Sequence, residues 1–181
     1  MASDKIESGS TMAEETALDG EKVGQLQEDI VRDLMAQAPA GWTQVRVTAT
    51  SIGGHMHFAA RGYVSDDDPD VMWPDVATIE TASLHKAMYE PGKGTWFSME
   101  CTVEPSGEYH FTFNYDQPAT FGDRVPAEES WINDLRRHPR DWDNIPDWHL
   151  VKQRYTEDEW LASVQRYKDW LASDDQSPFT G

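Results

Sequence analysis

The hydrophobic period of the chain changes from that of a helix to that of a strand near Trp42. Between Asp19 and Gln37, apolar residues recur every three or four positions, which places them on one stripe of an amphipathic helix. Pro39 ends this helix, because proline cannot continue its hydrogen-bond ladder. From Trp42 to Ser51, apolar and polar residues alternate instead. This pattern predicts a strand with one buried face.

Two pairs of strand-like segments, each joined by a glycine-containing turn, predict two hairpins. Gly53-Gly54 joins the first strand to a segment over His55 to Val64, since glycine adopts the positive φ that tight turns require. Thr95 to Val103 and Tyr109 to Tyr115 flank the turn Pro105-Ser106-Gly107 in the same way. We therefore expect an α+β fold, with an antiparallel sheet of at least four strands flanked by an N-terminal helix and C-terminal helices. The core positions predicted on this sheet are Val45, Val47, Phe58, Phe111 and Phe113.

Helices account for the rest of the predicted structure. A short helix is expected over Ile79 to Tyr89. A second lies between Pro126 and Pro139, with acidic residues in its first turn, where the helix dipole favours negative charge. The sequence Thr156-Glu157-Asp158-Glu159 is a capping box, and apolar residues at helical spacing follow it. The last third of the chain is therefore predicted to be helical with loops.

The predicted elements divide the chain into three parts. Residues 1–16 have no hydrophobic period, and we expect a disordered start or a vector-derived tail there. Residues 17–150 form the α+β domain, and residues 151–181 form a C-terminal amphipathic helix packed on it, with a polar tail. A length of 181 residues agrees with one domain and a short appendage. No segment approaches the roughly 20 apolar residues of a membrane span, so we expect a cytoplasmic protein without membrane contact.

The net charge of the chain disfavours some classes of binding partner and favours others. It has 33 acidic and 15 basic residues, a net charge of −18, and a pI of about 4.5. Such an excess opposes binding to nucleic acids and anionic membranes, and it suits a basic protein partner. The densest acidic run is Asp66-Asp67-Asp68-Pro69-Asp70, with Asp75 just beyond it. This run lacks the glycine turn and the terminal glutamate of a calcium loop, so we interpret it as a solvated or a protein-binding loop.

The residue types that carry chemistry form no complete catalytic or metal site in the sequence. His55 and His57 are spaced to share one strand face, as metal ligands do, and His110 or an acidic residue could supply a third ligand. Without a fixed third ligand, we interpret them as surface histidines. Cys101 falls in an apolar strand and is expected to be buried and unreactive. We predict no catalytic residues, no cofactor and no metal.

Two clusters in the last third of the chain have alternative interpretations. Arg136, Arg137, His138 and Arg140 form one basic cluster, which we expect to pair with nearby carboxylates or to cap its helix. Several tryptophans there either pack in the core or anchor an interface, because tryptophan is enriched at interface hot spots. The candidate partner-binding residues are Asp66, Asp67, Asp68, Asp70, Asp75, Trp142 and Trp148.

Three stretches, in this order and at this spacing, resemble the YezG-like immunity protein family. The first is Ala38-Pro39-Ala40-Gly41-Trp42 between helix and strand. The second runs from Gly94-Thr95-Trp96-Phe97 to Phe113-Asn114-Tyr115-Asp116, and the third joins Trp131–Arg140 to Asn144–Trp148. The resemblance covers roughly residues 28 to 148. It implies a small α+β protein without catalytic residues, which binds a cognate secreted bacterial toxin in the producing cell and blocks it.

The toxins of that family are commonly nucleases with basic surfaces, which agrees with a net charge of −18 on the inhibitor. We therefore expect an immunity protein that neutralises a cognate toxin, with its oligomeric state left open. Two alternatives remain at this point. One is an acidic adaptor or chaperone for a secreted basic protein. The other is a hydrolase that uses two facing carboxylates, a pair that sequence alone does not reveal.

Overall fold

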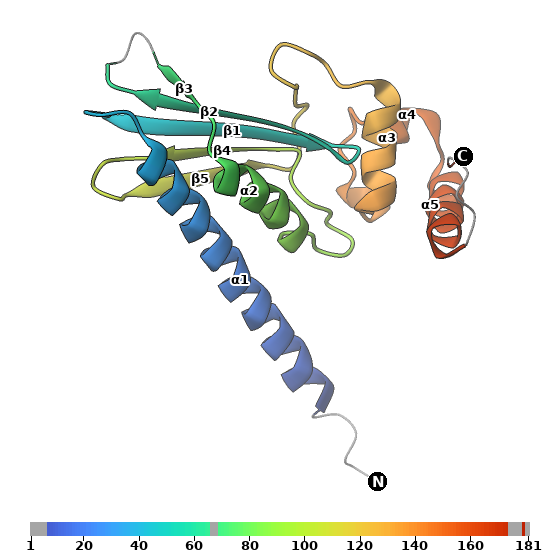
Figure 1. Ribbon diagram of the computed structural model, residues 1–181. Coiled ribbons are helices and arrows are strands. Elements are labelled where there is room, and N and C mark those ends of the chain that lie inside the picture. The colour runs from blue at the N-terminus through green and yellow to red at the C-terminus, as the bar shows by residue number, and fades with distance from the viewer. Residues whose placement is uncertain (1–6, 66–68, 174–178, 180–181) are drawn as a thin grey trace. The chain divides into compact units, whose positions relative to one another are not determined.

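The computed structural model describes residues 7–65, 69–173 and 179, which form one sheet and its flanking helices (Figure 1). The described residues contribute five antiparallel strands in the order β3-β2-β1-β4-β5. The elements are α1 (Glu7–Gln37), β1 (Gln44–Ile52), β2 (His55–Tyr63), β3 (Asp70–Met72), α2 (Asp75–Ala87), β4 (Ser98–Val103), β5 (Tyr109–Asn114), α3 (Glu128–Arg137), the 3-10 helix η1 (Trp142–Asn144), α4 (Leu150–Arg154) and α5 (Glu157–Ala172). The predicted α+β class and antiparallel sheet are confirmed.

The chain folds as two compact units, and most strands contribute residues to both. The first unit comprises residues 1–49, 58–88 and 100–112, and therefore holds α1, β3 and α2. The second comprises residues 50–57, 89–99 and 113–181, and holds α3 to α5. Segments that are far apart in sequence thus belong to one unit. The C-terminal helix, which we expected to form a part of its own from residue 151, is grouped with residues 113–150.

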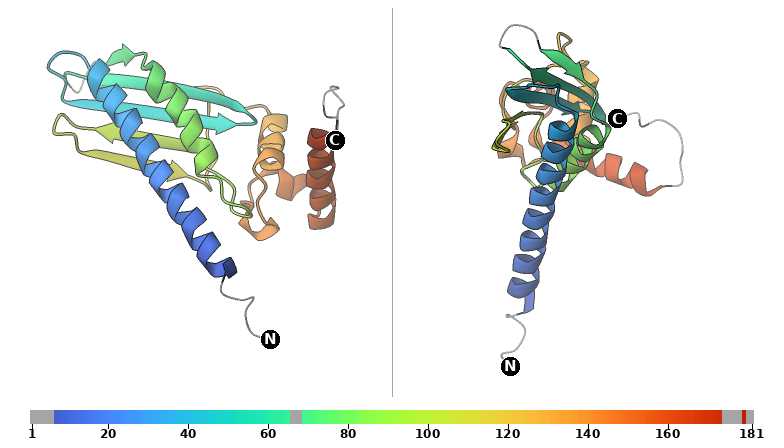
Figure 2. Two further views of the ribbon diagram at one scale, coloured as in Figure 1. Left: turned by 60° about the horizontal axis from the view of Figure 1, so that its bottom comes forward. Right: turned by 60° about the vertical axis from the view of Figure 1, so that its left-hand side comes forward.

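In the first unit, α1 and α2 lie side by side across one face of the sheet (Figure 2). Ile30 and Leu34 of α1 and Leu84 of α2 are fully buried. Val45 and Val47 of β1 are also fully buried, as predicted, because alternate residues of a strand point to the same face. The apolar stripe of α1 and the alternating apolar residues of β1 are therefore both buried in the core of the first unit.

Three predicted core residues, Phe58, Phe111 and Phe113, are only half-buried. Phe111 and Phe113 lie on β5, which is at the edge of the sheet and has a neighbouring strand on one side only. Phe58 lies on β2 outside residues 60–62, the part that pairs with the short strand β3. Alternation identifies the face of a strand, but it does not identify which strand lies at the edge.

The helix α1 begins at Glu7, well before the predicted start at Asp19. Residues 7–16, for which we expected a disordered start or a vector-derived tail, therefore belong to α1, while residues 1–6 lie outside the described part of the chain. Of these ten residues, three are glutamate, one is alanine and one is methionine, which favour helix without forming an apolar stripe. Because the prediction relied on such a stripe, it began where the stripe begins. Among the described helices, none has both the length and the apolar composition needed to cross a bilayer.

Two short elements were not predicted, β3 with three residues and α4 with five. Neither is long enough to show a hydrophobic period. The helix α2 begins at Asp75 rather than Ile79, and β4 begins at Ser98 rather than Thr95. These differences lie at element boundaries, where periodicity carries the least information.

The core of the second unit is built around the ring of Phe97. Its centroid lies 5.2 Å from that of Trp131 and 6.0 Å from that of Trp148, and it stacks on His149 at 6.2 Å. The other buried apolar residues of this cluster include Ile132, Leu135, Ile145, Val151, Trp160 and Val164. The predicted capping box at Thr156 is confirmed and begins α5.

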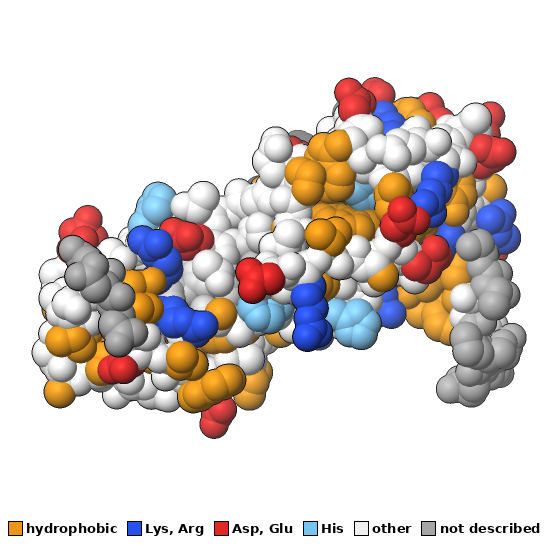
Figure 3. All heavy atoms as spheres, turned by 90° about the horizontal axis from the view of Figure 1, so that it is seen from above, with side chains coloured by type: hydrophobic (Ala, Val, Ile, Leu, Met, Phe, Trp, Pro, Cys, Tyr) orange, Lys and Arg blue, Asp and Glu red, His pale blue; other side chains and the backbone are white. Residues whose placement is uncertain are grey.

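The sheet face opposite α1 and α2 carries polar side chains (Figure 3). Within the first unit, Arg46 of β1 and Glu100 of β4 approach each other across this face, with 3.9 Å between Nε and Oε1. Thr48 and Thr112 are exposed there. The sheet is therefore of the half-buried type, which explains the alternation of its strands.

Candidate protein-binding surfaces

The structure describes two of the five predicted acidic binding residues, because Asp66, Asp67 and Asp68 lie outside the described residues. Asp70 is the first residue of β3, and Asp75 is the first residue of α2. Both are exposed. Asp75 lies in the first turn of its helix, where the dipole stabilises a carboxylate. The two carboxylates thus flank the short segment that connects β3 to α2.

That segment carries an exposed tryptophan, which sequence reasoning missed. Trp73 is 82% exposed, and Val71, two residues earlier, is 53% exposed. Met72 between them is buried, as alternation on β3 requires. Single exposed apolar residues are common on folded surfaces, so Trp73 is informative only together with its exposed apolar neighbours in sequence.

The first turns of α2 carry two more exposed apolar residues. Val76 and Ile79, spaced i and i+3, are 48% and 64% exposed. The buried stripe of α2 runs through Ala77, Thr81 and Leu84, so Val76 and Ile79 lie off the core-facing side. We call Val71, Trp73, Val76 and Ile79 the β3–α2 patch. Its acidic neighbours in sequence are Asp70, Asp75 and Glu80, and residues 70–80 include no lysine or arginine.

One sequence signal could have found this patch. If α2 is started at Asp75 after Pro74, the apolar residues of its first turns fall on two different sides of the helix. The prediction began the helix at Ile79, which left Trp73 and Val76 in an unassigned loop. Short strands and helix starts are therefore the positions at which an exposed apolar residue is most easily overlooked.

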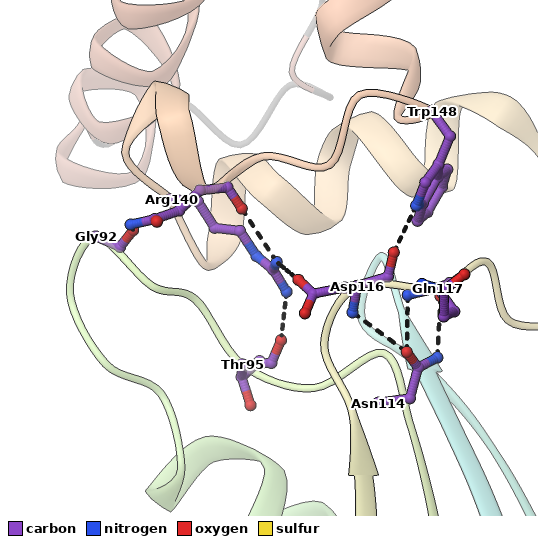
Figure 4. Close-up of polar contacts among 8 residues, drawn as sticks. Gly92, Thr95, Asn114, Asp116, Gln117, Arg140 and Trp148 are labelled. Carbon is purple, nitrogen blue, oxygen red and sulfur yellow. Dashed lines mark hydrogen bonds and ion pairs between the residues drawn. The ribbon is translucent and has the colours of Figure 1, made fainter.

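The two predicted tryptophans lie in the second unit, and both already have partners there. Trp148 contacts the rings of Phe97 and Trp131, and its Nε1–H donates a 2.6 Å hydrogen bond to the backbone oxygen of Asp116 (Figure 4). Trp142 packs against the aromatic core, and the Nζ of Lys152 lies 4.4 Å from the centroid of its ring. Both side chains are half-buried, so part of each remains open to solvent.

Most of the predicted basic cluster is used for internal pairing. Arg140 is buried over the ring of Phe97, and its Nη2 donates a 3.0 Å hydrogen bond to the backbone oxygen of Thr95 (Figure 4). Burial lowers the pKa of Arg140, and the nearby carboxylate of Asp116 opposes that shift. Arg136 is buried as well and donates through Nε to Ser163, at 3.1 Å. These guanidinium groups hold second-unit segments together.

A pocket of about 640 Å³ in the second unit opens beside Arg140. We call it the Arg140 pocket; its lining includes Glu90, Lys93, Tyr115, Asp116, Asp143 and Asn144. Lys93 and Glu90 form an ion pair at 2.6 Å, and Asp116 Oδ1 lies 3.8 Å from Arg140 Nη1. These two carboxylates therefore face cations, whereas acid–base catalysis by a carboxylate pair requires two that face each other across a substrate.

The remaining residues singled out by sequence form no reactive cluster. His55 is exposed and His57 is half-buried. Among the described residues, no three His, Cys, Asp or Glu side chains are arranged to hold a metal ion. Cys101 is buried, and burial raises its pKa to about 12, with Glu100 adding to the shift. A thiol in this state is a poor nucleophile.

Of the two surfaces, the β3–α2 patch is apolar with acidic neighbours, whereas the Arg140 pocket is polar and largely paired within itself. Contacts between proteins favour the first composition, since aromatic residues dominate binding energy and charged residues surround them. Neither a scan against protein-family models nor a search of curated proteins gives a match to this chain.

Proposed function

We propose that this protein is an immunity protein, which binds a cognate secreted toxin with a basic surface in the producing cell and blocks it. The observation that carries the proposal is that several of the basic side chains are buried or form ion pairs within the protein. Arg136 and Arg140 are buried. Arg32, Lys93 and Arg154 are held in ion pairs with carboxylates of their own units. These five of the 15 basic residues are therefore buried or ion-paired, and acidic residues outnumber basic ones 33 to 15 in the chain.

The uncompensated carboxylates face solvent. Asp143 and Asp147 of the second unit are exposed, as are the three acidic residues in the first turn of α5. In the first unit, Asp70 and Asp75 are exposed. Such a surface attracts a basic protein over several ångströms and speeds its association. A nuclease exposes cations where it binds phosphate, so an acidic protein that docks there competes with the substrate.

The alternatives receive less support. A carboxylate-dependent hydrolase requires facing carboxylates, whereas Glu90 and Asp116 in the Arg140 pocket face cations. An acidic adaptor for a secreted basic protein agrees with the same surface charge, and experiment separates it from an inhibitor. An adaptor binds its client before export and leaves the folded toxin active, whereas an immunity protein binds the folded toxin and abolishes its activity.

The proposal predicts that a secreted protein with a C-terminal toxin domain is encoded beside this gene, and the test uses that domain. Expression of that domain alone in a laboratory bacterium should arrest growth, and coexpression of the present protein should restore it. The purified partners should form a stable complex in gel filtration, and complex formation should suppress the toxin's activity in vitro. Growth arrest that persists on coexpression, together with no complex between the folded proteins, would falsify the proposal.

A further inference from the structure

We infer that the β3–α2 patch is the docking centre for the toxin, with Trp73 entering an apolar pocket of the partner and Asp70, Asp75 and Glu80 meeting cations around that pocket. The inference rests on the proposed function and adds the surface that performs it. It concerns the first unit alone. The predicted acidic residues Asp70 and Asp75 become the rim of this surface, and its centre is an aromatic residue.

The backbone on both sides of Trp73 is firmly held. Met72, the preceding residue, pairs with Ala60 of β2 and buries its side chain. Pro74, the following residue, is buried, and its carbonyl oxygen accepts a 2.6 Å hydrogen bond from Oγ1 of Thr78. The indole is thus presented to solvent from a fixed backbone. A preorganised anchor loses little conformational entropy on binding, which favours affinity.

The composition of the patch is that of an interface hot spot. Along this segment, the exposed aromatic residue Trp73 is flanked in sequence by three exposed aliphatic residues, Val71, Val76 and Ile79. Singly exposed apolar residues are ordinary on protein surfaces, whereas a group of them on one short segment marks a contact site. Tryptophan is among the residues whose truncation costs most binding energy.

Charge selects the occupant of the patch. Residues 70–80 carry three carboxylates, and the one basic residue that the sheet register places opposite this segment is Arg61 of β2, which pairs with Val71. The segment is still net negative, so the partner should bring lysine or arginine to its own rim. A second copy of this chain, paired about a two-fold axis, would place the same carboxylates on both sides of the contact. Like charges across an interface oppose association. The patch therefore fits a basic partner better than it fits self-association.

The first experiment measures binding of the purified toxin domain encoded by the neighbouring gene. Trp73→Ala should weaken its affinity by roughly 30-fold or more, mainly through faster dissociation, because a central anchor is lost. Ile79→Ala should weaken affinity less. Its matched control is Leu171→Ala on α5, a residue that is 60% exposed, close to the 64% of Ile79. The control should leave affinity within about twofold of the wild type.

A second set of variants tests the rim. The triple variant Asp70→Asn, Asp75→Asn, Glu80→Gln should slow association about tenfold at low ionic strength and reduce its salt dependence. The triple variant Glu157→Gln, Asp158→Asn, Asp169→Asn on α5 changes the net charge equally and should affect association much less. Because five of the six side chains are exposed and Glu80 is half-buried, urea unfolding should show nearly unchanged stability for both variants.

The outcomes separate the docking surface from the function. If wild type binds the toxin and Trp73→Ala binds it equally well, the docking assignment is wrong and the proposed function stands. If wild type does not bind the toxin at all, both are wrong. Sedimentation equilibrium supplies the remaining outcome. A concentration-dependent dimer that Trp73→Ala abolishes would show that a second copy covers the patch, which overturns the inference.

Discussion

The carboxylate of Asp33 on α1 accepts a 2.8 Å hydrogen bond from the backbone N–H of Ala77 in the first turn of α2. The N-cap residue of α2 is Pro74, whose side chain has no acceptor. Asp33 therefore supplies, from another helix, the acceptor that serine, threonine or aspartate normally supplies at an N-cap. The contact fixes the start of α2 against α1, next in sequence to the exposed Trp73.

Replacing Asp33 should destabilise the first unit. Asp33→Ala leaves the N–H of Ala77 without its acceptor, and we expect a loss of about 1 kcal/mol in the free energy of unfolding. Asp33→Asn keeps an oxygen acceptor and should recover most of this loss. Asp29→Ala is the matched control, since Asp29 on the same helix pairs only with solvent-exposed groups and should cost under about 0.5 kcal/mol. Urea unfolding measures all three, and equal losses for Asp33→Ala and Asp29→Ala would contradict the capping role.

The second prediction compares two phenylalanines. Phe97 is fully buried among three aromatic rings and the guanidinium of Arg140, so Phe97→Ala should cost about 3–5 kcal/mol. Phe113 is half-buried at the sheet edge, so Phe113→Ala should cost about half as much. Thermal or urea unfolding of both variants measures the difference. A larger loss for Phe113→Ala would mean that β5 is covered in the folded protein.

His149 gives the protein an acid-sensitive component of stability. Its ring is fully buried, and burial lowers its pKa from 6.5 to about 4, while the nearby carboxylate of Asp134 opposes the shift. The folded state therefore favours the neutral ring, whose Nδ1 accepts a hydrogen bond from the backbone N–H of Val151. Below pH 6.5 the unfolded chain binds a proton at this residue that the folded chain does not bind. The stabilisation gained by keeping His149 neutral in the folded state is fully present above pH 6.5. This part of the free energy of unfolding falls by about 3 kcal/mol as the pH approaches 4.

The measurement is the free energy of unfolding in urea between neutral pH and pH 4. His149→Asn keeps an acceptor for Val151, so the capping contact at α4 is retained while the titration is removed. Its stability should fall less steeply with acid than that of the wild type, even though lost ring packing lowers it overall. His110→Asn, at an exposed histidine, should follow the wild-type curve. Parallel curves for wild type and His149→Asn would refute the assignment.

Several features of the fold follow directly from local sequence. The stripe that includes Ile30 and Leu34 and the alternation of Val45 and Val47 each specify an element and its buried face. Gly53 and Gly54 adopt φ values of 64° and 83°, as the predicted hairpin turn requires. In each of these cases, the signal lies in neighbouring residues.

Other features depend on contacts that no local pattern contains. Phe113 alternates like a core residue, yet it lies at the edge because β5 pairs on one side only. The cap of α2 comes from Asp33, far away in sequence. From the sequence alone, Trp73 cannot be distinguished from a loop aromatic residue that packs in the core. Its exposure to solvent is seen only in the structure, where the preceding strand β3 pairs with β2. Acidic composition led us to expect a basic partner, but it did not identify the apolar centre of the proposed docking surface.

The last prediction distinguishes the Arg140 pocket from the β3–α2 patch. Gly94 has a φ of +81°, and a Cβ there would lie 2.6 Å from Nε of Arg140. Gly107 has a φ of +86°, but a Cβ there would meet nothing within 4 Å. Gly107→Ala should therefore cost about 1–2 kcal/mol from backbone strain alone. Gly94→Ala adds the displacement of Arg140 from Thr95 and should cost measurably more.

The Gly94 variant also serves as a functional control. It disturbs the Arg140 pocket without changing any residue of the β3–α2 patch. If the patch is the docking centre, Gly94→Ala should lower the melting temperature but leave toxin affinity within about twofold, measured well below that temperature. Trp73→Ala should show the opposite pattern, with unchanged melting and weakened binding, because an exposed ring contributes little to folding. If Gly94→Ala weakens binding and Trp73→Ala does not, the toxin docks at the Arg140 pocket, and the polar turn around Asp116 becomes the recognition site.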